Sequence, residues 1–157
     1  MKWDELRNED CPVARGLSVV GDRWTLLVLR DCFLGIRRFE EMQARLGITR
    51  HILADRLRKL EADGVLRREQ YQERPPRFEY RLTDKGKAFY PVLVSLIAWS
   101  EEHVPAKAGS AITLVSRDTG DPIAPVLTDE NSGQRITHRS VTALGKPRSG
   151  THGQTGG

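Results

Sequence analysis

Hydrogen-bonding side chains crowd the stretch TRHILADRLRKLEADG at residues 49–64. If this stretch is a helix, five of them could share its outward face: Thr49, Arg50, His51, Asp55 and Arg58. Hydroxyl, guanidinium, imidazole and carboxylate groups are the groups that exchange hydrogen bonds with base edges in the major groove of DNA. A solvated helix face is the alternative interpretation. Asp55 mildly favours that alternative, because a carboxylate repels phosphate, although it could accept from cytosine or orient Arg58.

Four further arginines are candidates for contacts with phosphate groups. Arg37 and Arg38 start the preceding helical segment, where free backbone N–H groups also attract anions. Arg74 and Arg77 flank a Pro-Pro pair and could reach the DNA backbone or the minor groove. Each phosphate contact would steepen the salt dependence of binding. Arg56 points partly inward and could brace the adjacent ribbon.

The composition is typical of a basic protein with one domain and an appendix. The 157 residues carry a formal net charge of +4, which favours a polyanionic partner. The basic excess collects in residues 37–58 and 65–85, whereas residues 1–22 are acidic. The sequence shows neither a signal peptide nor an apolar run long enough to span a bilayer. We therefore expect a cytoplasmic protein with no membrane partner.

Apolar residues recur at helical spacing in the segments that must position this stretch. The segments are 11–21, 23–35, 37–47 and 49–64, and each ends at a glycine. Asp22 and Thr49 stand where the second and fourth segments need N-caps. In the last segment Leu53, Leu57 and Leu60 form a buried stripe, which leaves the opposite face free.

The period changes after Gly64. Alternating residues predict strands at Val65–Tyr71 and Arg77–Leu82, with the Pro-Pro pair at the tip of a two-stranded ribbon. Thr83 is the expected cap of a further helix, with a kink or boundary at Pro91. Helix, glycine turn, helix and ribbon are the order of a winged helix-turn-helix, whose second helix enters the major groove.

The motifs CPV, DRWT, L-x-x-R-L-x-x-L-E-x-D-G and PPR-x-EY-x-LT follow one another in this order. The set resembles the HxlR family of bacterial transcription regulators, relatives of the MarR type, over about residues 8–104. The resemblance implies a homodimer formed through residues 1–20 and 86–103, with each half reading one half-site of an inverted repeat. It also implies repression or activation of neighbouring genes in response to a small-molecule effector or to thiol chemistry.

The two cysteines are too few for a disulfide framework or a zinc knuckle. Several relatives use a cysteine in the context of Cys11 to sense oxidants or electrophiles, and Arg15 could stabilise its thiolate. A structural role for Cys11 is the interpretation we favour, with a redox sensor as the alternative. We expect Cys32 to be inert core. No metal site and no cofactor are expected.

The composition shifts beyond Pro105. Residues 105–110 read as a linker, and residues 111–143 hold three strand candidates, AITLVSR, PIAPVLT and QRITHRSV. Longer relatives carry cysteine–glycine knuckles here, but this chain has Thr119-Gly120 and Ser132-Gly133, so we expect a metal-free β-meander. Its packing residues would be Ile112, Leu114, Ile123, Val126, Leu127 and Ile136. Residues 144–157 are expected to be a disordered tail.

The expected fold is therefore α+β. It comprises a winged helix-turn-helix domain at residues 1–104, with N- and C-terminal dimerisation helices, and a small C-terminal β-meander. The expected function is a homodimeric, sequence-specific regulator, a repressor, that binds double-stranded DNA. The alternative is a winged-helix protein-interaction module without specific DNA binding. An enzyme is the third and least favoured hypothesis, because the sequence has no glycine-rich phosphate loop and no nucleophile with an evident base.

Overall fold

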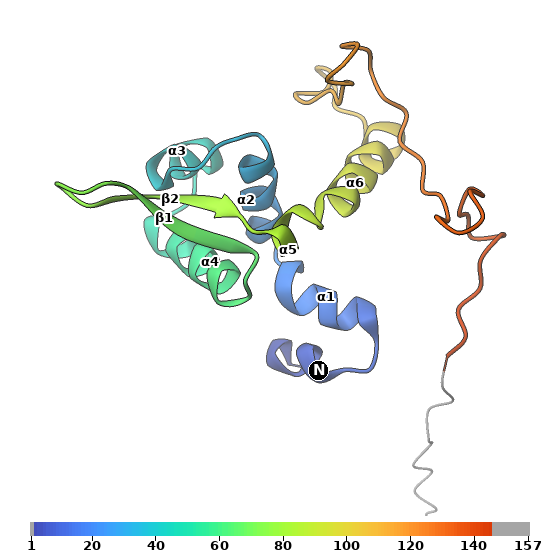
Figure 1. The fold of residues 1–157 in the computed structure, drawn as a ribbon, viewed down its shortest axis with the longest axis horizontal. Coiled ribbons are helices and arrows are strands. Elements are labelled where there is room, and N and C mark those ends of the chain that lie inside the picture. Colours follow the sequence, from blue (N-terminus) through green and yellow to red (C-terminus); the bar gives the residue numbers. More distant parts are fainter. Residues whose placement is uncertain (1, 146–157) are drawn as a thin grey trace, which may run out of the picture. The chain divides into compact units, whose positions relative to one another are not determined.

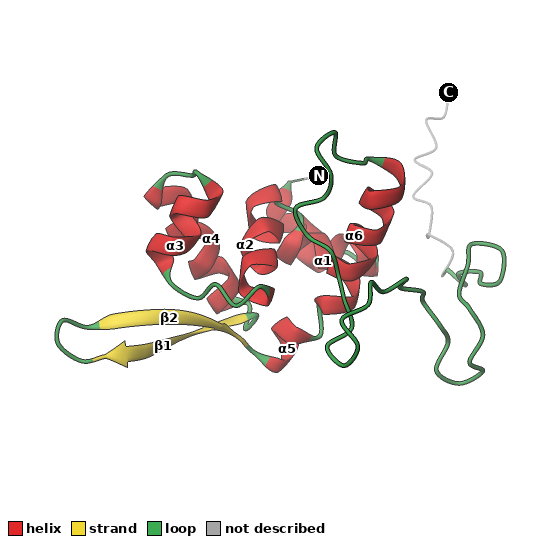
Figure 2. Ribbon diagram, turned by 90° about the horizontal axis from the view of Figure 1, so that it is seen from above, coloured by secondary structure: helices red, strands yellow, loops and turns green. Residues whose placement is uncertain are grey.

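The computed structural model of this chain describes residues 2–145. The chain divides into two compact units, the first ending at Ile97 and the second beginning at Ala98. The first unit is α+β, as predicted, with α2, α3 and α4 on one side of a two-stranded antiparallel sheet (Figures 1 and 2).

Five helices precede the sheet, and their bounds follow local signals in the sequence. They are the 3₁₀ helix η1 (Trp3–Asn8), α1 (Pro12–Val20), α2 (Arg23–Phe33), α3 (Phe39–Leu46) and α4 (Arg50–Ala62). The carboxylate of Asp22 accepts from the backbone N–H groups of Trp24 and Thr25, so the predicted cap of α2 is confirmed. Gly47, with φ of 64°, makes the left-handed turn between α3 and α4. Only η1 was not predicted.

The ribbon follows as strands β1 (Leu66–Gln72) and β2 (Arg77–Leu82), which agree with the prediction to within a residue. The register runs from Leu66 opposite Leu82 to Gln72 opposite Arg77, with an irregularity between Gln70 and Gln72. Its tip extends away from α2, α3 and α4 (Figures 1 and 2). This hairpin is the wing.

The core of the first unit lies where α2, α3, α4 and β1 meet. The predicted stripe of Leu53, Leu57 and Leu60 is buried, with no more than 1% of each residue exposed. Burial of a leucine side chain stabilises a fold by about 1.5–3 kcal/mol. The stripe therefore fixes α4 against the core and determines which of its faces is turned outward.

The helix predicted after Thr83 is divided in two, as expected from Pro91. Its parts are α5 (Asp84–Lys87) and α6 (Tyr90–His103). Proline has no N–H to donate, and its ring would clash with the carbonyl group of Lys87 in a continuous helix. The helix is therefore broken at residues 88–89, and a second one starts ahead of Pro91.

We expect Gly86→Ala to lower the free energy of unfolding by about 2 kcal/mol, because overpacking of a tight contact is costly. Gly86 is buried in α5, and a Cβ there would overlap the carbonyl oxygen of Val65. Gly16→Ala is the matched control, because a Cβ in the middle of α1 meets nothing within 4 Å. That control should gain about 0.5–1 kcal/mol. Urea denaturation at equal protein concentration measures both, and equal effects would contradict the predicted contact.

The three strands predicted at residues 111–143 do not form as strands in the part of the chain that the structure describes. Two isolated bridges, Val115 with Pro122 and Thr128 with Arg135, each close a tight turn instead. Of the expected packing residues, Ile123, Val126 and Leu127 are exposed. Without a shared apolar face, the three segments cannot stabilise a sheet.

The two turns repeat one hydrogen-bond pattern. In the first, the amide of Ile123 donates to Leu114, and in the second, the amide of Ile136 donates to Leu127. Polar side chains stabilise each turn from inside: the Ser116 hydroxyl accepts from the Asp118 amide at 3.3 Å. Asp129 accepts in the same way from the amide of Asn131. The linker at 105–110 and the other proposed domain limits remain predictions, and residues 146–157 of the expected tail lie outside the described residues.

Candidate nucleic-acid interface

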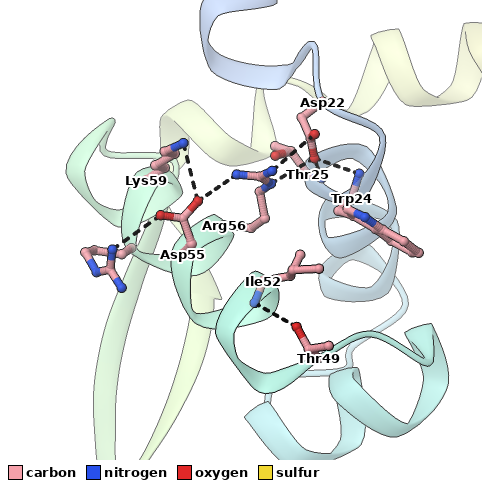
Figure 3. Close-up of polar contacts among 9 residues, drawn as sticks. Asp22, Trp24, Thr25, Thr49, Ile52, Asp55, Arg56 and Lys59 are labelled. Atoms are coloured by element: carbon pink, nitrogen blue, oxygen red, sulfur yellow. Dashed lines mark hydrogen bonds and ion pairs between the residues drawn. The ribbon is translucent and has the colours of Figure 1, made fainter.

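The first turn of α4 carries three of the predicted base-reading residues. Thr49 is the N-cap, and its hydroxyl accepts from the amide of Ile52 at 3.3 Å (Figure 3). Arg50 and His51 follow and are exposed. The side chain of His51 is exposed and forms no hydrogen bond or ion pair within residues 2–145. The hydroxyl of Thr49 serves the helix, whereas the other two side chains are turned outward.

Arg50 is held by α3 while it remains exposed. Its guanidinium lies 4.6 Å from the ring centroid of Phe39. A carboxylate oxygen of Glu40 is 3.9 Å away, in a pair whose two side chains are mostly exposed and which is therefore weak. A cation over an aromatic ring gains about 0.5–1 kcal/mol at an exposed site. Phe39 thus supports the side chain without using up its hydrogen-bond donors.

Asp55 is the centre of an ionic cluster on α4. Its carboxylate oxygens lie 2.7 Å from Arg56, 3.4 Å from Arg58 and 3.3 Å from Lys59. Burial raises the pKa of Asp55, but the hydrogen bond from Lys59 and the neighbouring positive charges outweigh it, and the net pKa is lowered. The carboxylate of Asp55 is therefore ionised and already paired with these three cations. In the unbound protein it orients Arg58, whose side chain remains 69% exposed.

The sequence suggested that Arg56 braces the wing, but in the structure Arg56 joins α4 to α2. Its guanidinium donates to both carboxylate oxygens of Asp22, at 2.9 and 3.3 Å, and at 2.7 Å to Asp55. Figure 3 shows it between these two acids. Because Asp22 is also the N-cap of α2, the two helices are connected through one carboxylate. A paired, half-buried guanidinium of this kind is a structural element and not a reader of bases.

The four arginines predicted to contact phosphate groups are all exposed: Arg37, Arg38, Arg74 and Arg77. Arg37 and Arg38 were predicted to start the helix that precedes α4, but α3 begins at Phe39, with Arg38 as its N-cap and Arg37 before it. The carbonyl oxygen of Arg37 accepts from the amide of Tyr80 at 2.8 Å, which joins the segment ahead of α3 to β2. The guanidinium of Arg38 lies 4.6 Å from the ring centroid of Tyr71 on β1. Arg74 and Arg77 flank the tip of the wing. Sequence reasoning missed the aromatic partners Phe39 and Tyr71, because nothing in the sequence marks such distant pairs.

The two cysteines lie in different environments. Cys11 is exposed and is the N-cap residue of α1. The guanidinium of Arg15 donates to the carbonyl oxygens of Glu9 and Asp10, at 2.9 and 2.7 Å. Cys32 is buried, as predicted, and burial together with the charge of Asp31 raises the pKa of its thiol to about 12. Such a thiol is not reactive at neutral pH.

The described part of the chain offers neither a metal-binding cluster nor a helix suited to cross a membrane. Between residues 2 and 145, no three His, Cys, Asp or Glu side chains are grouped so that they could hold a metal ion. None of the helices within the same range has the length and apolarity that crossing a membrane requires.

Comparison with known proteins gives consistent results. A profile described as HxlR-like helix-turn-helix matches residues 19–108. An uncharacterized HTH-type transcriptional regulator of Mycobacterium tuberculosis (strain ATCC 25618 / H37Rv) is 41% identical over 136 residues, which cover 87% of this chain and 86% of that protein. The uncharacterized HTH-type transcriptional regulator YvaP of Bacillus subtilis (strain 168) is 36% identical over 100 residues, which cover 62% and 93%.

Two solved structures extend the likeness to the fold. The crystal structure of PA1607, described there as a candidate transcription factor, superposes with a TM-score of 0.79 at 39% identity, over 88% of this chain and 96% of that one. The redox regulator HypR in its reduced form superposes with a TM-score of 0.56 at 33% identity, over 60% and 94%.

Proposed function

This chain belongs to the HxlR-like helix-turn-helix family of transcriptional regulators, and from that premise we propose that it is a sequence-specific repressor. It acts as a homodimer on an inverted-repeat operator and has no catalytic activity. One observation carries the proposal: Arg50, His51 and Arg58 are exposed on α4 while the leucine stripe of the same helix is buried. A helix anchored in this way presents a fixed set of donors to the major groove.

The roles of the remaining interface residues follow from their contacts. We propose that Thr49 contributes to base reading from its position at the helix start, and that Asp55 acts by orienting Arg58. Arg37, Arg38, Arg74 and Arg77 contact phosphate groups on either side of α4, and the ring of Tyr71 holds Arg38 in place. Phosphate contacts add affinity without sequence preference, so the α4 face alone discriminates between operators.

Homodimer formation is supported by apolar side chains that the first unit leaves exposed. On α1, Val13 is 67% and Leu17 is 44% exposed, and on α6, Val92 is 55% and Leu96 is 43% exposed. Each pair lies one helical turn apart and so forms a stripe. We propose that these stripes meet their equivalents in a second copy of the chain.

Selection of preferred duplexes from a random pool tests the proposal. The expected result is an inverted repeat with half-site centres about 10 base pairs or a multiple apart, bound by two chains per duplex. Raising the salt should weaken the binding steeply. A dimer that binds selected duplexes no better than shuffled ones would instead support the alternative, a winged-helix module for protein interaction.

Leu96→Glu should convert the dimer to a monomer, because it places a charge in the proposed apolar interface. The monomer should bind the selected operator at least about 100-fold more weakly, since it reaches a single half-site and loses the contacts of the second. Sedimentation velocity and fluorescence anisotropy measure the two effects. Leu144→Glu is the control, because Leu144 is 98% exposed. Dimeric Leu96→Glu with full operator affinity would contradict the proposed interface.

Cys11 remains a candidate for redox sensing, next to the structural role that we favour. Its exposure is required for reaction with an oxidant, and HypR, a structural relative, is described as a redox regulator. If Cys11 senses oxidants, Cys11→Ser should fold normally and remove any oxidant response of DNA binding, measured with and without hydrogen peroxide. A response that persists in this variant would assign sensing to another group.

A further inference from the structure

A pocket of about 840 Å³ lies between η1, the end of α1, the start of α2 and the second half of α4. Ligand pockets in proteins typically have volumes of about 300–1,000 Å³. Its walls include Trp3 from η1, Asp22 and Arg23 at the start of α2, and Arg56 and Lys59 from α4. None of the residues that we assign to DNA contacts lines it, so a ligand could occupy this pocket independently of DNA.

One wall of the pocket is aromatic. The indole of Trp3 lies so close to Gly21 that a Cβ on that glycine would be 2.7 Å from the Cη2 atom of the ring. The missing side chain thus lets the indole edge approach the segment between α1 and α2. Trp3 nevertheless remains 51% exposed, which leaves indole surface available to a planar ligand.

The charges of the pocket favour an anion. Two of its acids are already neutralised: Asp22 accepts from Arg56, and Asp63 forms a 2.6 Å ion pair with Arg7. Arg23 has no carboxylate partner within the described residues, and its guanidinium lies 5.0 Å from the ring centroid of Trp24. Lys59 shares the single carboxylate of Asp55 with two arginines. Asp4 is the remaining acid, so incompletely neutralised positive charge predominates in the lining.

We propose that this pocket binds a small aromatic carboxylate. The ring of the ligand stacks on Trp3, and its carboxylate pairs with Arg23 and Lys59. Such a ligand contacts η1, α2 and α4 at the same time. The inferred effect of the ligand on DNA binding rests on the proposed function. The inferred binding of the ligand in the pocket does not.

The link to DNA passes through Asp55. A ligand carboxylate that pairs with Lys59 withdraws this lysine from Asp55, which then has only Arg56 and Arg58 as partners. Arg56 already pairs with Asp22, so the carboxylate of Asp55, once it has lost Lys59, pairs more closely with Arg58. An Arg58 held more tightly by Asp55 is less available to DNA, so the ligand should weaken operator binding.

Isothermal titration calorimetry with 2-naphthoate, without DNA, tests occupancy. The wild-type chain should bind 2-naphthoate at least about tenfold more tightly than 2-naphthalenemethanol, because the alcohol lacks the charge. Arg23→Gln and Trp3→Leu should each weaken the binding of 2-naphthoate about tenfold. Arg117→Gln, a change at an exposed arginine outside the pocket, should leave it unchanged. Absence of binding, equal affinity for acid and alcohol, or variants that bind like the wild type would overturn the site.

Fluorescence anisotropy with the selected operator tests the link. Saturating 2-naphthoate should weaken DNA binding about tenfold, which lies within the usual range of coupling between sites. Arg23→Gln should lose this effect at the same ligand concentration. Unchanged DNA affinity with a filled pocket would overturn the regulatory link, but it would not contradict the ligand-binding site. A chain that binds no duplex contradicts the proposed function, and occupancy is then decided by calorimetry alone.

Discussion

The double variant Arg50→Ala, His51→Ala is expected to bind its selected operator no better than a shuffled duplex of equal length. A well-formed contact with a base edge is worth about 1–3 kcal/mol of discrimination, so two contacts account for roughly 100-fold or more. Binding to unrelated DNA should weaken far less, because it depends on phosphate contacts that the variant retains. Competition titrations at fixed salt, with circular dichroism to confirm the fold, measure the ratio of specific to non-specific affinity.

The chain offers a matched control for this change. His138→Ala, Arg139→Ala removes the same two side-chain types from adjacent exposed positions in the second unit. Both variants lose the same charge, but this control should keep the full preference for the operator, because neither of its residues belongs to α4. If the α4 variant also keeps that preference, α4 does not read the groove and the assignment of its outward face is wrong.

Features determined by local chemistry could be predicted from the sequence. The side chain of Asp22 caps α2 and that of Thr49 caps α4, because each accepts from backbone amides two or three residues further on. The leucine stripe of α4 and the break ahead of Pro91 follow from helical spacing and from the missing donor of proline. The wing was predicted almost to the residue, since alternation on both sides of a Pro-Pro tip leaves few other pairings.

Features that depend on distant partners were missed. The segment Trp3–Asn8 shows no periodicity, and it is tied down by the ion pair of Arg7 with Asp63 and by the contact of Trp3 with Gly21. The sequence at 111–143 has short apolar runs between turn residues, which resemble strands. Those runs remain largely exposed and cannot assemble a sheet without a common core. The structure therefore contains the predicted turns between them but not the predicted strands.

The aromatic supports of the candidate interface show the same limit. Arg50 and Arg38 could be named as candidates because charge and position are visible in the sequence. Their partners Phe39 and Tyr71 look like ordinary apolar or strand residues in the sequence. Only the packing of α3 against α4 brings Phe39 beneath Arg50, and only the folded wing brings Tyr71 beneath Arg38. The sequence therefore identifies the candidate side chains, while the fold determines how firmly each is held.

We expect Asp31→Ala to lower the free energy of unfolding by about 3 kcal/mol, the lower end of the cost of breaking a buried ion pair. The side chain of Asp31 is fully buried in α2. Its carboxylate accepts from Arg30 at 2.7 and 2.9 Å, and from Arg45 of α3 at 3.4 Å. The lower end applies because both arginines are partly exposed and can turn toward water once the acid is gone. Urea denaturation of the two proteins measures the difference.

A double-mutant cycle of Asp31→Ala with Arg45→Ala isolates the part of this energy that joins α2 to α3. We expect a coupling above about 1 kcal/mol, because one partner is buried. The exposed pair of Arg67 and Glu69 on the wing is the control and should give about 0.5 kcal/mol or less. Since Arg45 lies in the last turn of α3, just before Gly47, we expect this coupling to help set the angle at which α4 leaves the turn. A coupling no larger than that of the wing pair would mean that the apolar core alone sets this angle, and operator affinity should then be insensitive to Arg45→Ala.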